Sequence, residues 1–559
     1  MNKFKIFLTR HLMRPTIIRI IIISFFLLFL FACQGGGATG AGTTRLTYYV
    51  KAGGNDFHDG LSDSAAWATI PKVQATVKSG DTVYFRSQDT WTSATPPVLT
   101  ATAGVTYDGS TYGSGTRATL QATGDANLYP NYSVVKIEAS NVTFKGFNVD
   151  MDSKKTGGIY IGYMCASNTT NVTIDNCVVH DSLLGPTDWA YGILVSNKLG
   201  YTVSNISITN STVYNHSHEG IAVYAGWANA ADRNDTVLIR GNTVYNCGTG
   251  VLIANDSDNV IVEYNNLYEN TSQGIYMRVS PPYEGYVTSG PDAMIIRYNI
   301  IRDTTIAGIL IGNPRNVSMG GAFYGNLIYN NGKNTDGNVN GADFIIAGVT
   351  GYTYPGNVFN IYNNTFYSID KPLSNYAFMV GIGVGGDDPE GITVNFKNNI
   401  VYYNTAQTGS NRYPIWDRYN RMTHSNNLVY RSSSASDTHV MLYAGADVLY
   451  YNRAGGASDI TNWETSAQKS DPAFTGGTLP TGFTGTYGTN MVPNTNYFAI
   501  TSGDALNNGA TLGSLYNGCI NGAGLATPII RPEEGAYDIG AYEYIGNYPP
   551  VAPERQLVK

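Results

Sequence analysis

A short phrase recurs ten times between residues 144 and 430, and it limits the possible folds more than any other feature of this 559-residue chain. Each copy places small or polar residues, most often Asn, between hydrophobic residues, and most copies end on Tyr. The shortest step between copies, from Asn242 to Asn265, is 23 residues, and the longest, from Asn326 to Asn364, is 38. A unit that repeats on this scale predicts a stacked array of coils rather than a mixed globular core.

A second motif, a Gly followed by alternating residues, predicts what each coil contains. Examples are GIYIG (158–162), GIAVY (220–224) and GILIG (308–312), in which the first and third residues after Gly are aliphatic. We expect these to point into one interior and the alternate residues to point outward. The repeats carry short β-branched runs broken by Asn, Asp and Gly, and no helical apolar stripe. Strands stacked about 4.8 Å apart would then form an all-β parallel β-helix.

The recurring Asn and Tyr residues are predicted to be structural. Asn tolerates the left-handed turn conformation, and its amide can bond the same Asn in the next coil. The Tyr side chains should stack in a similar column, which comprises Tyr214, Tyr245, Tyr268, Tyr329, Tyr367, Tyr402 and Tyr430.

Four segments carry a resemblance to a known family. TYYVKAGGNDFHDG and its continuation (47–86), GVTYDGSTYGSGTRATL (104–120), DPAF (471–474) and DIGAYEY (538–544) resemble bacterial right-handed parallel β-helix repeat lipoproteins of the pectate-lyase-like superfamily. The resemblance implies a right-handed parallel β-helix with a short N-terminal capping helix and an irregular C-terminal cap. That superfamily includes lyases, hydrolases and epimerases of acidic polysaccharides, and members without known activity. The resemblance therefore indicates the fold strongly and an activity only weakly.

The N-terminus is predicted to be a targeting segment. Basic residues precede an apolar run from Ile20 to Ala32, which is short for a membrane span and typical of a signal peptide at 1–32. Cys33 follows a small residue, which resembles a bacterial lipidation site; the alternative is an ordinary signal peptide. Residues 33–44 would be the lipidated Cys and a flexible tether. By resemblance to Gram-negative lipoproteins, Gln34 favours anchoring to the outer membrane, on its periplasmic or cell-surface side.

The remaining chain divides by pattern. Residues 45–125 are predicted to hold the N-terminal cap and first coils, with an amphipathic helix within 65–78 that covers the open end of the solenoid. Residues 126–435 hold the repeats, 436–546 the final coils and the C-terminal cap, and 547–559 a loose tail. We expect a monomer.

Charge and cysteine content limit the partners. The chain has 41 acidic and 34 basic residues, which argues against nucleic acid because such proteins carry a basic stripe. A polysaccharide partner, even an acidic one, needs only a local basic patch. The cysteines outside the targeting segment lack metal-like spacing, and buried thiols are favoured over disulfides: Cys165, Cys177, Cys247 and Cys519.

Unequal coil lengths indicate where a site would lie. Insertions at 181–191, 225–235 and 279–291 flank the Gly-Ile strands, and loops on a rigid scaffold are the usual place for binding residues. Aromatic residues in or beside them are predicted to stack on sugar rings, although ordinary loop packing is an equal alternative: Trp189, Trp227, Tyr276, Tyr283 and Tyr286.

The same strands carry a candidate catalytic set. His218 and Glu219 precede one strand, Tyr224 should face outward on it, and Arg278 should occupy the same outward column two coils later. A lyase or epimerase of uronates needs a cation for the carboxylate and a base for the adjacent proton. We assign these roles to Arg278 and His218, with Tyr224 or Tyr276 as the acid.

Alternatives to this assignment stay open. A hydrolase would need two carboxylates, for which Glu219 with Asp188 or Asp232 is the set available. His218 and Glu219 could instead be turn residues that bond the backbone. The sequence identifies no cofactor with certainty; calcium is a candidate at NDSDN (255–259) and GDDPEG (386–391), although neither completes a calcium loop. Two functions follow: an acidic-polysaccharide lyase or epimerase-like enzyme, and a non-catalytic glycan-binding or adhesive surface lipoprotein.

Overall fold

The computed structural model describes the chain from residue 44 to 544 with gaps. The described residues are 44–125, 133–182, 190–225, 231–279, 290–312, 319–333, 341–347, 356–369, 376–380, 391–404, 414–417, 421–431, 439–443, 448–451, 460–525, 529–531 and 536–544. No helix among them is long and apolar enough to cross a membrane. The targeting predictions for residues 1–43 lie outside the described residues.

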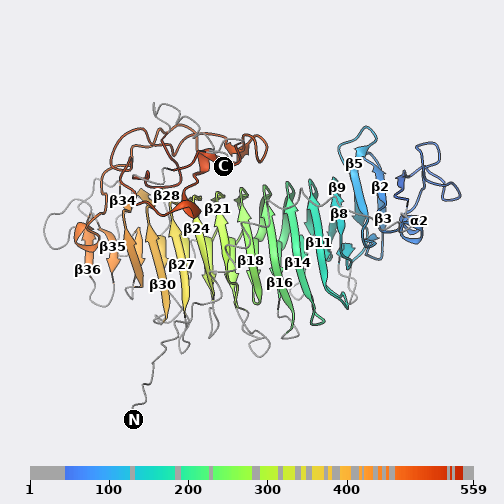
Figure 1. Cartoon of the computed structure of the whole chain (residues 1–559), viewed down its shortest axis with the longest axis horizontal. Coiled ribbons are helices and arrows are strands. Elements are labelled where there is room, and N and C mark those ends of the chain that lie inside the picture. The colour runs from blue at the N-terminus through green and yellow to red at the C-terminus, as the bar shows by residue number, and fades with distance from the viewer. Residues whose placement is uncertain are drawn as a thin grey trace, which may run out of the picture. The chain divides into compact units, whose positions relative to one another are not determined.

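One parallel sheet, here called sheet A, runs the length of the stack. Figure 1 shows its strands side by side, and neighbouring strands, which come from successive coils, are hydrogen-bonded to each other. Its strands are β1 (Thr47–Val50), β2 (Thr82–Arg86), β5 (Thr106–Tyr112), β8 (Val142–Lys145), β11 (Thr169–Asp175), β14 (Thr202–Thr209), β16 (Arg233–Arg240), β18 (Ser257–Glu263), β21 (Met294–Arg297), β24 (Gly320–Tyr324), β27 (Asn357–Tyr362), β30 (Ile392–Lys397) and β33 (Met422–Ser425).

The other strands form two further rows, of which the first carries the Tyr repeat and is called the tyrosine strands. β15 and β17 are long enough to run through both rows. The tyrosine strands are β3 (Thr90–Ser93), β6 (Ala118–Ala122), β9 (Phe147–Lys154), β12 (Val178–Ser182), the first part of β15 (Thr212–Tyr224) and of β17 (Thr243–Ala254), β19 (Asn266–Tyr268), β22 (Ile300–Arg302), β25 (Leu327–Tyr329), β28 (Thr365–Ile369), β31 (Ile400–Asn404) and β34 (Leu428–Arg431).

The last row, the glycine strands, carries the Gly-Ile motif. Its strands are β4 (Leu99–Thr100), β7 (Ser133–Ile137), β10 (Gly157–Ile161), β13 (Ile193–Val195), the second parts of β15 and β17, β20 (Gln273–Arg278), β23 (Ala307–Gly312), β26 (Ala342–Ile346), β29 (Tyr376–Val380), β32 (Ile415–Asp417) and β35 (His439–Tyr443). β36 (Val448–Tyr451) pairs antiparallel with β35 and β37 (Phe483–Thr484) with β38 (Val492–Pro493). The predicted all-β parallel β-helix is thus confirmed.

The interior is filled by the residues that the Gly-Ile alternation predicts. Ile221 and Val223 of β15 are fully buried in the main core, in register with Val251 and Ile253 of the next coil. Ala222 and Tyr224 alternate with them and belong to a separate cluster on the outer side. Period-two alternation therefore separates one interior from one outer surface along these strands.

The Asn residues form the predicted ladder. The side-chain amide of Asn265 donates to the carboxamide oxygen of Asn299 (3.0 Å), and that of Asn299 donates to Asn326 (3.0 Å). The chain of bonds runs from Asn242 to Asn427, where Glu464 accepts from both the backbone and the side chain of Asn427. A carboxylate ends the ladder because it accepts without having to donate.

The Tyr column is confirmed in two separate stacks, Tyr214–Tyr245–Tyr268 and Tyr367–Tyr402, whereas Tyr329 packs against Phe498 of the C-terminal segment. The rings of Tyr214 and Tyr245 lie 5.0 Å apart and nearly parallel, and Tyr245 stacks on Tyr268 at 4.9 Å. His180 extends the stack on one end, 5.0 Å from Tyr214. Arg302 takes the column position after Tyr268, with its guanidinium 4.2 Å from that ring.

A short helix lies at the N-terminal end, as expected. α2 spans Ile70–Thr76, with Thr69 as its N-cap and Ile70 and Val73 buried. It is shorter than the predicted 65–78 stretch because Trp67 lies in an extended bridge to Val50 and not in a helix.

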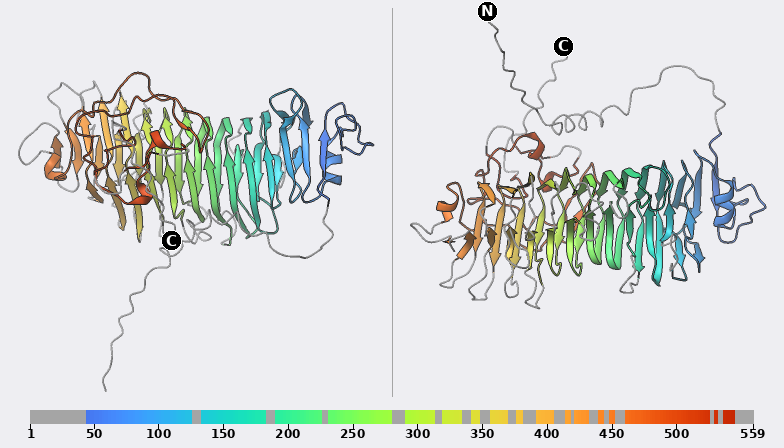
Figure 2. Two further views of the ribbon diagram at one scale, coloured as in Figure 1. Left: turned by 45° about the horizontal axis from the view of Figure 1, so that its top comes forward. Right: turned by 90° about the horizontal axis from the view of Figure 1, so that it is seen from below.

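The C-terminal segment is irregular and lies along the outside of the coils (Figures 1 and 2). It contains α3 (Ile460–Trp463) and the 3₁₀ turns η2 (Ser514–Tyr516) and η3 (Ile520–Gly522). Asn363 donates to the carbonyl of Tyr516 (3.1 Å), and Asn398 to that of Ala510 (2.7 Å). The turn asparagines of the coils therefore hold this segment in place.

The four cysteines outside the targeting segment are buried free thiols, as favoured from the sequence. Burial raises the pKa of Cys177, Cys247 and Cys519 to about 12, so all three are protonated at neutral pH.

Candidate functional site

The candidate site lies on the outer face of the glycine strands. The parallel register places Tyr224, Ala254 and Arg278 in one column on three successive coils. The adjacent column holds Ala222, Leu252 and Tyr276. The sequence-based placement of Arg278 two coils after Tyr224 is confirmed, at about 10 Å along the stack.

Aromatic residues form much of the surface around this column. An outer-face cluster comprises Tyr160, Tyr163, Tyr191, Leu194, Ala222, Tyr224, Leu252 and Ala254, with Met164 and Tyr276 packed against it. Most of these side chains are buried, although they lie outside the solenoid core. The glycine strands thus present an apolar, tyrosine-rich outer layer in which charged groups are partly desolvated.

His218 is at the edge of this layer. Its ring lies 5.1 Å from that of Tyr191 in an edge-to-face arrangement, and its Nδ1 contacts the carboxylate of Glu219. Burial lowers the pKa of His218 to about 4, and the positive charge of Arg278 acts in the same direction. The imidazole is therefore neutral at pH 7, and the electrostatic effect of Arg278 reaches it.

Arg278 provides the cation of the site. Its guanidinium lies 5.3 Å from the ring centre of Tyr276. Its Nε is buried without a hydrogen-bond partner, and no Asp or Glu of the described residues forms an ion pair with it. Burial raises the pKa of Tyr276, so this phenol is protonated at neutral pH.

Glu219 and Tyr224 lie deeper. The side chain of Glu219 is 8% exposed where it contacts His218. Tyr224 is 1% exposed and packs in the outer-face cluster. The structure therefore brings His218, Glu219, Tyr224, Tyr276 and Arg278 together, but with Tyr276 rather than Tyr224 as the accessible phenol.

The predicted aromatic loop residues cannot be placed. Trp189, Trp227, Tyr283 and Tyr286 lie outside the described residues, as does Asp188.

The hydrolase alternative gains no support from the other carboxylate considered. Asp232 is fully buried and accepts the backbone N–H of Gly200 (2.6 Å). It also lies near Lys198, so it serves the local packing.

Sequence reasoning missed several residues of this surface. Tyr160, Tyr163 and Tyr191 surround the site, and Lys198 lies 4.9 Å from the ring centre of Tyr163. Burial lowers the pKa of Lys198 to about 8. The outward position after Gly in each Gly-Ile motif would have identified Tyr160, because Tyr276 occupies the same position. No comparable signal marks Tyr191 or Lys198.

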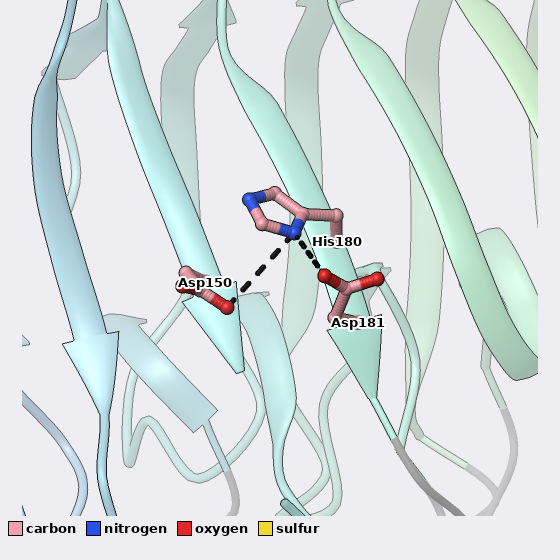
Figure 3. Close-up of side chains that lie close together, drawn as sticks. All are labelled: Asp150, His180 and Asp181. Atoms are coloured by element: carbon pink, nitrogen blue, oxygen red, sulfur yellow. Dashed lines mark hydrogen bonds and ion pairs between the residues drawn. The ribbon is translucent and has the colours of Figure 1, made fainter. Parts of the chain in front are cut away.

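A separate group on the tyrosine strands has the composition of a metal site (Figure 3). His180 Nδ1 lies 2.8 Å from Asp181, and its Nε2 lies 3.0 Å from the side-chain oxygen of Asn148. Asp150 accepts from Gln121 (2.8 Å) and from the backbone N–H of Asp152 (2.7 Å). Both ring nitrogens are engaged, so the group is a hydrogen-bonded extension of the Tyr column rather than an open set of ligands.

The first calcium candidate, NDSDN (255–259), lies within the described residues. Asp256 is fully buried, 3.5 Å from Arg233, and Asp258 accepts from the backbone N–H of Asp292 (3.2 Å). Burial and the nearby carboxylates of Asp292, Asp235 and Asp256 raise the pKa of Asp258 to about 6. Most of the 386–391 motif lies outside the described residues, so calcium stays a prediction.

Comparison with known proteins agrees with this architecture. The family model of the right-handed β-helix region matches residues 158–350. The chain is a right-handed parallel β-helix protein. The resemblance drawn from the sequence is confirmed at the level of the fold, while its lipoprotein part stays a prediction. No curated protein is detectably similar in sequence.

Similar solved structures include an epimerase, a lyase and a biosidase. The mannuronan C-5 epimerase AlgE4 A-module of Azotobacter vinelandii is 15% identical, with 71% of this chain and 96% of that one covered and a TM-score of 0.43. The pectate lyase Pel9A is 15% identical over 90% and 97%, with a TM-score of 0.39. The GH136 lacto-N-biosidase of Eubacterium ramulus is 14% identical over 68% and 67%, with a TM-score of 0.42.

Proposed function

We propose that the protein is an enzyme of acidic polysaccharides that removes a proton beside a uronate carboxylate, as a lyase or an epimerase does. The observation that carries the proposal is Arg278. Its guanidinium is partly buried among aromatic side chains and has no carboxylate partner within the described residues, and it lies near a neutral imidazole. This pairing supplies an anion site and a proton acceptor on one surface.

Arg278 would neutralise the uronate carboxylate. A desolvated guanidinium without an internal ion pair binds a carboxylate more strongly than one that already has a partner. Neutralising the carboxylate also lowers the cost of placing a second negative charge on the adjacent carbon when the proton leaves.

His218 would accept that proton. The contact between its Nδ1 and the carboxylate of Glu219 would hold the imidazole ring in place. Arg278 depresses the pKa of the imidazole when no substrate is bound. A carboxylate bound to Arg278 would cancel part of that charge, so substrate binding itself would make His218 a stronger base.

Tyr276 would provide the acid. Its phenol is protonated at neutral pH and lies beside Arg278, within reach of a substrate held by that residue. Glu219 orients the imidazole, and Tyr224 supports the layer from beneath. Trp189, Trp227, Tyr283 and Tyr286 are assigned to the walls of the substrate groove.

Location is part of the proposal. The predicted signal peptide at 1–32 and the Cys at position 33 support export and a lipid anchor in the outer membrane, with residues 34–44 as the tether. A protein at this location would meet polysaccharide substrates outside the cytoplasm.

The decisive experiment offers the purified protein a panel of uronate polysaccharides. Lyase activity appears as absorbance of the unsaturated product, epimerase activity as deuterium taken up from heavy water, and hydrolysis as reducing ends. We expect lyase or epimerase turnover in the parent and its loss in His218→Gln. Arg302→Ala is the matched control, because Arg302 also stacks on a tyrosine but belongs to the tyrosine strands. Retention of a polysaccharide without any turnover would instead establish a glycan-binding protein.

A further inference from the structure

A pocket lies between sheet A and the C-terminal segment. Its volume is about 220 Å³, and it is lined by Tyr264, Arg297 and Tyr298 of the coils and by residues between 514 and 530 of the segment. Ligand pockets for drug-sized molecules measure about 300–1,000 Å³, so this one suits a smaller ligand, about the size of one sugar residue.

The wall formed by the coils carries an excess positive charge. The carboxylate of Glu263 is fully buried and accepts from Nε of Arg240 (2.6 Å) and from Nε of Arg297 (2.6 Å). One carboxylate neutralises one of the two guanidiniums, which leaves this trio with one unbalanced positive charge. The ring of Tyr487 covers Arg240 at 4.1 Å, and Arg297 is the arginine of the trio that lines the pocket.

Arg297 keeps a donor for the pocket. Its Nη1 donates to the hydroxyl of Tyr324 (2.8 Å), and its Nη2 makes no hydrogen bond to any described residue. The side chain is 26% exposed, and it lines the pocket. A guanidinium that presents a spare N–H to a small cavity is suited to an anion.

Two buried or half-buried carboxylates in the described part of the C-terminal segment already have partners of their own. Glu543 accepts from Nη1 of Arg531 (2.9 Å). Asp538 accepts from the backbone N–H groups of Asn507 (2.8 Å) and Tyr544 (2.5 Å). Both acids are therefore engaged within their own segment.

Two tyrosines complete the pocket. The rings of Tyr264 and Tyr298 lie 5.4 Å apart, and burial raises the pKa of both, so they are neutral phenols. Together they provide an apolar wall with hydroxyl groups, which is suited to a ring that carries both C–H and O–H groups.

We propose that this pocket binds one uronic acid residue, with its carboxylate on Arg297 and its ring against Tyr264 and Tyr298. The site is distinct from the candidate catalytic surface because it lies on the sheet A side of the coils. It would hold a free uronate or the end residue of a uronate chain.

The test is calorimetric titration with galacturonate and glucuronate, and with glucose as the neutral control. It is carried out on the parent and on Arg278→Ala, so that any uronate bound at the glycine strands is removed. We expect saturable uronate binding to persist in Arg278→Ala and glucose to bind at least about tenfold more weakly. If a triuronate binds as tightly as the monomer, the ligand of the pocket is the end residue of a uronate chain. If the triuronate does not bind, the ligand is the free uronate.

Two variants test the assignment within the Arg278→Ala protein. Arg297→Gln removes the donor, and Ser514→Glu places a negative charge on an exposed residue that lines the pocket. Both should weaken uronate binding at least about tenfold. If Arg297→Gln unfolds the protein, Ser514→Glu still tests whether the pocket binds uronate, because this variant changes only an exposed residue. The proposal is overturned if Arg278→Ala binds no uronate, if glucose binds equally well, or if Ser514→Glu binds uronate unchanged.

Discussion

The Asn ladder makes a quantitative prediction at Asn299. Its carboxamide oxygen accepts both the backbone N–H (3.0 Å) and the side-chain amide (3.0 Å) of Asn265, and its own amide donates to the carbonyl of Val262 (2.9 Å). Asn299→Ala leaves the buried backbone N–H of Asn265 without an acceptor, although the Asn265 side chain keeps two carbonyl partners. An unsatisfied buried group costs about 1–3 kcal/mol, and the lost bonds of Asn299 add about 1 kcal/mol. We expect a total loss of about 3 kcal/mol.

The chain itself offers a matched rescue. Ser211 occupies the same ladder position, and its hydroxyl accepts the backbone N–H of Cys177 (3.1 Å) while it donates to the carbonyl of Thr209 (2.8 Å). Asn299→Ser should therefore restore the acceptor for Asn265 and cost less than Asn299→Ala. Asn496→Ala is the surface control, because that side chain is exposed and the change should be nearly neutral.

The assay is hydrogen exchange of the peptide that contains residues 263–268, together with urea unfolding. Because about 1.4 kcal/mol corresponds to a factor of ten, a loss of 3 kcal/mol should speed exchange of the Asn265 amide by roughly a hundredfold. Exchange in Asn299→Ala within about twofold of the parent would refute the reasoning. So would a serine variant no more stable than the alanine variant.

Three further predictions concern acid stability, the anion site and the membrane anchor. His216 is fully buried between Ser182 (2.8 Å) and the carbonyl of Val179 (3.3 Å), and burial lowers its pKa to about 4 from an unfolded value of 6.5. The neutral imidazole stabilises the fold fully above pH 6.5, and this stabilisation is lost as the pH falls toward 4, by up to about 3 kcal/mol. His216→Asn should therefore flatten the pH dependence of the urea midpoint. An unchanged pH profile would contradict this prediction. Arg278→Ala should weaken binding or turnover of an acidic glycan more than tenfold with the fold intact, and Arg278→Lys should recover only part of it, whereas parental affinity in Arg278→Ala would place the site elsewhere. Cys33→Ser should move the processed protein from the membrane to the soluble fraction, and its retention on membranes would exclude a lipid anchor at that residue.

The repeat alone determined the solenoid and its ladders. Two local patterns carry this information: the hydrophobic alternation around Gly220 and Gly250, and the recurrence of Asn265, Asn299 and Asn326. When identical positions stack, the first buries its aliphatic residues in one interior and the second forms a ladder of side chains. The interior residues, the Asn ladder, the Tyr column and the outward placement of Arg278 could all be predicted, because the register of a parallel stack follows from the sequence spacing.

Tertiary structure alone decided which groups meet. Tyr191, His218 and Arg278 come together because four successive coils stack, and the electrostatic effect of Arg278 on His218 depends on their separation and on the burial around them. The end of the Asn ladder at Glu464 and the pocket beside Arg297 depend on a C-terminal segment that has no repeat. Irregular chain carries no periodic signal, so where it lies is determined by packing against distant residues, which only the folded structure reveals.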